Sequence, residues 1–180
     1  MKKLFVLPAL LVLLFSSGCI KKNGQMGKSV FSISNDLESS GGFSGNENNV
    51  YTLVKESAHS GVIACRIDSI NKYGYLFRTR INQLPVTNFK KIKFSCWCSL
   101  NDAASKASLV ISIDDNTGKQ LLWSGNEINK TVKTPKEWGE VSVDADLSKF
   151  NQPDNKISIY VWNNSNAAIY SDDYKIEFFE

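Results

Sequence analysis

The sequence predicts an all-β fold, a two-sheet antiparallel sandwich of the jelly-roll type with about ten strands. Apolar and polar residues alternate with a period of two along most of the chain, whereas the 3.6-residue period of amphipathic helices is nearly absent. Clusters of turn-forming residues separate the alternating segments at intervals of roughly 8–15 residues. Many short strands at such spacing are typical of sandwiches, so this fold class follows from pattern alone.

Ten segments carry the alternation. In order along the chain they are residues 30–34, 50–55, 61–68, 73–81, 90–100, 107–114, 119–123, 138–145, 156–162 and 168–178. Glycine, serine, asparagine, aspartate and proline, which form turns, gather between them, for example at residues 39–42 and 151–155. The turn residues 114–118 separate two apolar runs, which predicts a hairpin with Gly118 in the left-handed conformation.

Within several segments the apolar residues occupy alternate positions, and we expect the face they share to lie in the core. The two cysteines of segment 90–100 lie on the same side as its apolar residues, and Cys65 alternates with isoleucines in the same way. The residues expected to point inward are Ile63, Cys65, Ile67, Phe77, Thr79, Ile92, Phe94, Cys96, Cys98, Leu100, Ile157, Ile159 and Val161.

Three cysteines follow Cys19, namely Cys65, Cys96 and Cys98. Residues two apart on a strand lie about 6.5 Å apart and point the same way, which is near the upper limit for a disulfide. Either all three are buried thiols that pack as small apolar side chains, or Cys65 is bridged to Cys96 or Cys98 in an oxidising compartment. An odd number leaves at least one thiol free in both cases.

The first residues of the chain indicate export. Lys2 and Lys3 precede an apolar run over residues 4–15, which is shorter than the roughly 20 residues of a membrane-spanning helix. Small residues then lead to Cys19, and this order is typical of a secretory signal peptide. The Gly18-Cys19 ending resembles a bacterial lipoprotein signal, in which the cysteine carries a diacylglyceryl group. The alternative is an ordinary cleaved signal peptide.

The chain therefore divides into a signal peptide (1–18), the lipidated Cys19 with a tether (19–29), and a jelly-roll domain (30–180). The tether is polar, contains two glycines and lacks periodicity, as flexible linkers do. Two or more acyl chains anchor a protein stably. Because Ile20 stands where inner-membrane lipoproteins carry aspartate, the resemblance implies the outer membrane, with the domain on either its periplasmic or its outer side.

The charge of the chain argues against a nucleic-acid partner. The formal net charge is +3, and removal of Lys2 and Lys3 with the signal peptide leaves +1 (3 − 2). The lysines of the remaining chain alternate with acidic residues, whereas nucleic-acid binding needs a clustered basic face.

Four groups of residues resemble strands of the jelly-roll carbohydrate-binding modules of families four, nine and twenty-two, the galactose-binding-like sandwiches. They are Ala58-His59-Ser60-Gly61, Lys93-Phe94-Ser95-Cys96-Trp97, Trp138 with Glu140-Val141-Ser142-Val143, and Ile159-Tyr160-Val161-Trp162-Asn163 with Ile169-Tyr170-Ser171-Asp172-Asp173. They occur in the order that the family shows and the match covers roughly residues 30–178. The resemblance implies a sandwich that binds a glycan.

The same resemblance implies a structural calcium ion that ties the first strand to the last. Its candidate ligands here are Glu38 near the end of the first strand and Asp172 or Asp173 in the last. Calcium takes six to eight oxygen ligands, and carboxylates with backbone carbonyls suit it. The alternative is a solvated acidic turn without an ion.

Sugar binding requires an aromatic ring that stacks on the apolar face of a pyranose, with polar groups nearby for the hydroxyls. If the cysteines and isoleucines above face the core, then Trp97, Tyr160 and Trp162 face outward, and Arg78 and Arg80 bring donors to such a face. We therefore expect these five residues to bind the glycan. The alternative is that loops or residues 46–51 cover the rings and extend the core. Trp138 is assigned to packing, and Trp123 has no assignment.

The sequence shows no sign of an enzyme. Asp144 and Asp146 are the one alternating acidic pair at a strand end, and they differ from the glutamate pattern of hydrolytic jelly rolls. His59 is the sole histidine, and no serine stands in a nucleophile-elbow motif. We therefore expect a non-catalytic, membrane-anchored lipoprotein that binds glycan. The alternative is a structural or protein-partner-binding envelope lipoprotein that has lost the sugar site.

Overall fold

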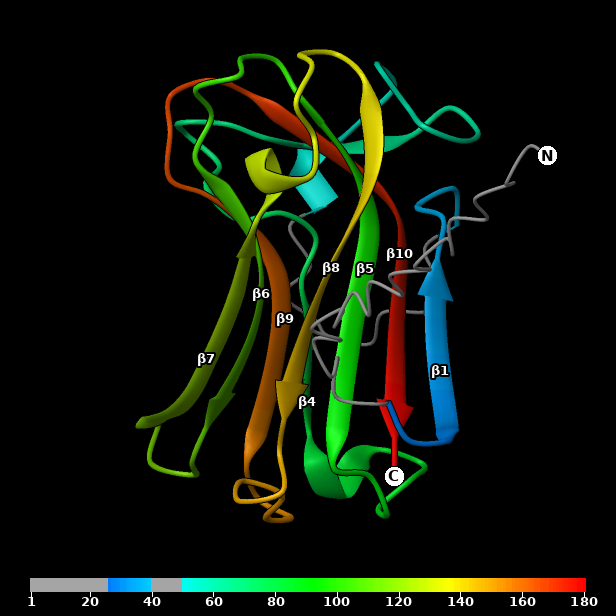
Figure 1. Ribbon diagram of the computed structural model, residues 1–180, viewed down its shortest axis with the longest axis vertical. Helices are drawn as coiled ribbons and strands as arrows, with labels where there is room; N and C mark the ends of the chain where they lie inside the picture. Colours follow the sequence, from blue (N-terminus) through cyan, green and yellow to red (C-terminus); the bar gives the residue numbers. More distant parts are fainter. Residues whose placement is uncertain (1–25, 40–49) are drawn as a thin grey trace, which may run out of the picture.

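The computed structural model describes residues 26–39 and 50–180, so the expected signal peptide, Cys19 and most of the tether lie outside the described residues. Within these two ranges, ten strands form two antiparallel sheets, which confirms the all-β sandwich (Figure 1). The strands are β1 (Ser29–Asn35), β2 (Leu53–Val54), β3 (Ala64–Ile67), β4 (Phe77–Arg80), β5 (Lys91–Leu100), β6 (Ala107–Asp114), β7 (Gln120–Glu127), β8 (Trp138–Asp146), β9 (Lys156–Asn163) and β10 (Ile169–Phe179). No helix in this part of the chain has the length and apolar content that a bilayer crossing requires.

The two sheets differ in size and in how their strands connect. The smaller sheet has the order β4-β9-β6-β7, and the larger has the order β2-β3-β10-β5-β8 with β1 also paired to β10. Figure 1 shows β7, β6 and β9 on the left and β5, β10 and β1 on the right. Strand neighbours are mostly distant in sequence, as in a jelly roll.

Strand β10 changes its partner halfway along one edge. Its first part pairs with β3, from Ile169 to Ser171, and its last part pairs with β1, from Tyr174 to Phe179. A register shift against β5 falls between Asp172 and Lys175, at the same place. The two aspartates of β10 therefore lie where the edge of the sheet passes from β3 to β1.

The predicted hairpin joins β6 and β7. Gly118 has φ = 88°, as expected, and its N–H donates to the carbonyl oxygen of Asp115. The Asp115 carboxylate accepts the N–H groups of Thr117 and Lys119 at 2.8 and 3.0 Å, so an acidic side chain shapes this turn.

The core fills the space between the sheets with residues of both inner faces. On the larger sheet, the Phe94 ring stacks on Tyr174 with centroids 5.7 Å apart, and the Phe89 ring meets Phe178 edge-on at 5.0 Å. The Tyr174 hydroxyl is 2.6 Å from Ser171 Oγ, which satisfies two polar groups in the interior.

Three expected strand segments are shorter than predicted. Residues 50–52 form a 3₁₀ turn, η1 (Val50–Thr52), and Tyr73 contributes only an isolated bridge to Trp162 before β4 begins at Phe77. Residues 61–63 are not strand because the N–H groups of Val62 and Ile63 bond to a carboxylate and not to a neighbouring strand. Alternation describes side chains, whereas strand assignment depends on these backbone bonds.

The three thiols are buried and unbridged, which agrees with the first alternative for the cysteines. The Sγ atoms of Cys96 and Cys98 are 3.5 Å apart on the inner face of β5. Cys65 Sγ lies 3.2 Å from the hydroxyl of Thr52. Burial raises the pKa of the Cys65 and Cys96 thiols above the usual value, so both are held in the unreactive thiol form.

We expect the folded Cys19→Ser variant to resist the thiol reagent DTNB at neutral pH. Thiolates are the reactive species; burial raises the pKa of the Cys65 and Cys96 thiols, and all three thiols are buried from the reagent. Absorbance at 412 nm should report three thiols per chain after denaturation in guanidinium. Release of only one thiol after denaturation would instead show a disulfide.

Candidate functional site

A groove of about 770 Å³ lies on the outer face of the smaller sheet, a volume within the range of small-ligand sites. Its lining residues are Tyr51, Ile70, Asn71, Lys72, Tyr73, Leu76, Arg78, Ser112, Asp114, Gln120, Trp123, Ser158, Tyr160 and Trp162. Strands β4, β9, β6 and β7 supply the floor, and residues 70–76 supply one wall.

Strand register explains why these side chains meet. Directly paired residues of an antiparallel sheet point to the same face. One row across the sheet runs from Arg78 through Ser158 and Ser112 to Trp123. The adjacent row runs from Tyr160 through Val110 to Gly125. The two rows together place polar and aromatic side chains on one surface of the sheet.

Trp123 lies across Gly125 on strand β7. A Cβ atom at Gly125 would overlap the six-membered ring of this indole. The absence of a side chain at Gly125 therefore lets the indole rest on the sheet, with 46% of the residue exposed. A broad aromatic surface is thus available on the groove floor.

Four further aromatic residues, Tyr51, Tyr73, Tyr160 and Trp162, join Trp123 in the groove. The Tyr73 ring meets the Tyr160 ring edge-on with centroids 5.6 Å apart, and Tyr73 bridges to Trp162 through the backbone. Burial raises the pKa of the Tyr160 hydroxyl, an effect that hydrogen bonds with the side chains of Ser112 and Trp123 partly offset. The hydroxyl stays protonated at neutral pH and can both donate and accept hydrogen bonds.

Exposed apolar surface is concentrated in this groove. The described residues include five strongly exposed large apolar or aromatic side chains, and these are Tyr51, Val62, Ile70, Tyr73 and Trp123. All of them except Val62 line the groove. Clustered exposed apolar surface of this kind marks an interaction site more often than scattered residues do.

The structure brings together three of the five residues expected to bind glycan. Tyr160, Trp162 and Arg78 line the groove, and the Arg78 Nε–H donates to Ser158 Oγ at 3.3 Å. Arg80 projects from the same sheet in the next row, paired with Lys156, and is not part of the lining. The alternative that residues 46–51 cover the rings falls mostly outside the described residues, but Tyr51 of that stretch lines the groove.

Trp97 does not belong to the same surface, which corrects the expectation of one platform. It lies on β5 of the larger sheet, paired with Glu140 and Asp172, and therefore faces away from the groove on the opposite side of the sandwich. The His59 ring stacks on Trp97 with centroids 3.9 Å apart and planes 11° apart, and Trp138 lies beside it. Local alternation predicts that a side chain points outward, but it does not predict which of the two sheets the strand joins.

Sequence reasoning missed Trp123 and Tyr73. The predicted hairpin brings the strand of Trp123 beside the strand of Ser112, but the pairing of these two residues depends on a register shift between Ile113 and Asp114 that the turn alone does not predict. Tyr73 offered no comparable signal, since it lies in a segment that mostly forms no ladder.

The three expected calcium ligands gather around one loop of the larger sheet. Asp172 is fully buried, and burial raises the pKa of its carboxyl, partly offset by bonds from backbone N–H groups. Asp173 bonds to His59, and Glu38 bonds to Val62 and Ile63. Within the described ranges, no group of three or more His, Cys, Asp or Glu side chains is arranged to hold a metal ion.

The sequence matches no family model and no curated protein. The structure is similar to the CBM22-1 xylan-binding domain of Paenibacillus barcinonensis Xyn10C, with a TM-score of 0.52 and 14% identity over 87% of this chain and 97% of that one. It is also similar to the CBM22-1 and GH10 modules of Clostridium thermocellum endo-1,4-β-D-xylanase 10B complexed with xylohexaose, with a TM-score of 0.52 and 14% identity over 86% of this chain and 29% of that one. The domain therefore has the fold of the β-sandwich carbohydrate-binding modules.

We expect Gly125→Ala to displace the Trp123 indole, because the added Cβ needs the space of its six-membered ring. In protein labelled with 5-fluorotryptophan, the ¹⁹F resonance of Trp123, assigned with Trp123→Phe, should shift while the other three tryptophan resonances stay in place. Gln120→Ala on the same strand is the control and should leave Trp123 unmoved. An unshifted resonance in Gly125→Ala would contradict this packing.

Proposed function

We propose that this protein is a non-catalytic lipoprotein, anchored in the outer membrane, whose sandwich domain binds a glycan in the groove of the smaller sheet. The concentration of exposed aromatic side chains in one groove with polar lining is the observation that carries the proposal. The carbohydrate-binding-module fold is consistent with it.

The groove offers both kinds of contact that a sugar needs. Trp123 and Tyr73 present apolar ring surface, on which the C–H face of a pyranose can stack. Lys72, Arg78 and Gln120 are exposed in the same lining and can hydrogen-bond to hydroxyl groups. Aromatic rings for stacking and polar groups for hydrogen bonds are therefore present in one groove.

The lining also supports a binding role over a catalytic one. Asp114 is the single carboxylate among the described residues that line the groove. Glycoside hydrolysis generally uses two carboxyl groups placed across the scissile bond. A groove with one carboxylate and several aromatic residues is better suited to hold a glycan than to cleave it.

Xylo-oligosaccharides are the first ligands to test. The similar domain from P. barcinonensis is xylan-binding, and the similar C. thermocellum modules are complexed with xylohexaose. Other soluble β-glucans and galactans complete the panel, because the fold alone leaves the sugar unspecified.

We expect Trp123→Ala to weaken glycan binding by about 10–100-fold, because a stacked aromatic residue at the centre of a site carries much of the binding energy. Isothermal titration calorimetry with the tightest-binding glycan of the panel measures the change. The matched control is Trp97→Phe on the opposite sheet, which keeps a ring against His59 and should bind as the unaltered protein does.

The reverse result, with loss of affinity in Trp97→Phe and none in Trp123→Ala, would move the site to the larger sheet. Absence of binding by folded protein to every glycan of the panel would favour the structural or protein-partner lipoprotein instead.

Lipidation of Cys19 is the second part of the proposal. The short apolar run and the Gly18-Cys19 ending support it. We expect the protein to fractionate with outer membranes and to enter the detergent phase of Triton X-114, since two or more acyl chains anchor it. Cys19→Ser should move it to the aqueous phase. A wild-type protein in the aqueous phase would indicate an ordinary cleaved signal peptide.

A further inference from the structure

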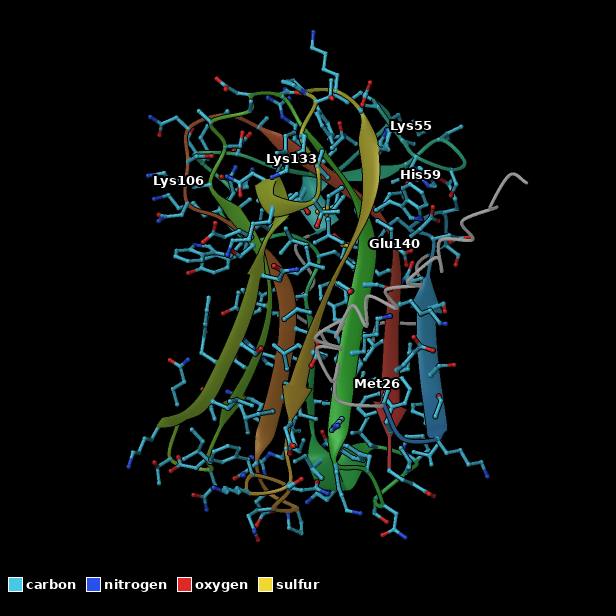
Figure 2. All side chains as sticks on the ribbon, viewed as in Figure 1. Met26, Lys55, His59, Lys106, Lys133 and Glu140 are labelled. Atoms are coloured by element: carbon cyan, nitrogen blue, oxygen red, sulfur yellow. The ribbon has the colours of Figure 1, made fainter. Side chains whose placement is uncertain are left out.

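Residues 59–63 form a loop that fills the gap on the edge of β10, where pairing passes from β3 to β1. Four of its five backbone N–H groups donate to carboxylate oxygens of the chain itself. We call these five residues and the carboxylates of Glu38, Asp172 and Asp173 the carboxylate clamp. Figure 2 labels His59, which lies near the upper end of the molecule in that view.

Glu38 holds one side of the clamp. Its Oε1 atom accepts the N–H groups of Val62 and Ile63, both at 2.7 Å. Gly61 has φ = 56°, and a Cβ atom there would overlap the Glu38 side chain. The glycine therefore serves both the left-handed backbone and the close approach of the carboxylate.

Asp172 holds the other side from the interior. Its Oδ2 atom accepts the N–H groups of His59 and Ser60 at 2.9 and 3.1 Å, and its Oδ1 atom accepts the N–H of Asp173 at 2.8 Å. The residue is fully buried. These three bonds compensate for the removal of a carboxylate from water.

Asp173 closes the clamp with two side-chain bonds. It has φ = 49° and lies at the register shift of β10. Its Oδ2 atom lies 2.6 Å from His59 Nδ1, and its Oδ1 atom accepts the Ser60 hydroxyl at 2.8 Å. The His59 ring also stacks on Trp97, so the loop is fastened to β5 as well as to β10.

This arrangement does not fit the calcium ion that the family resemblance implies. A carboxylate oxygen has two lone pairs, and both are taken at Glu38 Oε1 and at Asp172 Oδ2. The N–H groups that take them direct the positive ends of their dipoles at these two oxygens, which disfavours a cation on the same oxygens. Calcium needs six to eight oxygens, and the imidazole of His59 is not one of its preferred ligands.

We propose that the carboxylate clamp replaces a calcium ion in this protein, so that the junction between the first and last strands is closed by the chain's own N–H, O–H and imidazole groups. Stability of the fold is then independent of calcium. The inference concerns the larger sheet and does not rest on the glycan groove.

Thermal unfolding of the purified full-length protein, followed by circular dichroism in 5 mM CaCl₂ and in 5 mM EGTA, tests the proposal. We expect the two Tm values to agree within about 1 °C. A native-state ligand at about 100 times its Kd would raise the Tm of a domain of this size by roughly 5–10 °C. Elemental analysis after dialysis in EGTA should find less than 0.1 calcium per chain. A Tm difference of several degrees, or near-stoichiometric calcium, would overturn the proposal.

His59→Phe tests the clamp directly. Phenylalanine keeps a ring against Trp97 and removes the nitrogen that bonds to Asp173. We expect a Tm lower by roughly 4–8 °C, because a bond to a partly buried carboxylate is lost. The matched control is Val62→Ala in the same loop. The Val62 side chain is exposed, and the variant keeps the backbone N–H that bonds to Glu38. A Tm of His59→Phe equal to that of the control would show that His59 does not close the clamp.

Discussion

The groove depends on the strand register of the smaller sheet. Each inward isoleucine of β9 places its neighbour outward, and pairing with β4, β6 and β7 then sets Arg78, Ser158, Ser112 and Trp123 in one row. A slip of one residue in any pair would exchange the core face and the groove face of that strand. Burial of the inner face is therefore the force that also positions the outer face.

Along one edge of β10, the larger sheet has a gap between two partner strands. β10 is too long for one partner on that side, and the change from β3 to β1 leaves its backbone without a ladder near Asp172. The N–H groups of His59 and Ser60 bond here to the Asp172 carboxylate, and the N–H of Asp173 bonds to the other oxygen of the same carboxylate. Because polar groups buried without partners cost free energy, this gap requires such a dense set of donors and acceptors.

The outer faces of the two sheets therefore differ in how their aromatic residues are used. The smaller sheet carries aromatic surface toward solvent, whereas two outward aromatic residues of the larger sheet, Trp97 and Trp138, pack around His59. Identical residue types with identical outward orientation therefore differ in role because their neighbours differ. The fold is similar to that of the solved CBM22 domains, and the position of Trp123 over Gly125 is set by the residues of this chain.

Alternation along the sequence determined the all-β class, the ten strands and the inward face of β5 and β9, because these are local consequences of a two-residue period. The turn-forming residues 114–118 determined the left-handed Gly118, which is also a local property. Alternation also placed Tyr160, Trp162 and Arg78 outward. Only the tertiary structure decided which strands are neighbours, and hence that Trp97 lies opposite the groove and that Trp123 lies within it. Strand pairing joins residues far apart in sequence, and a local period carries no information about such partners.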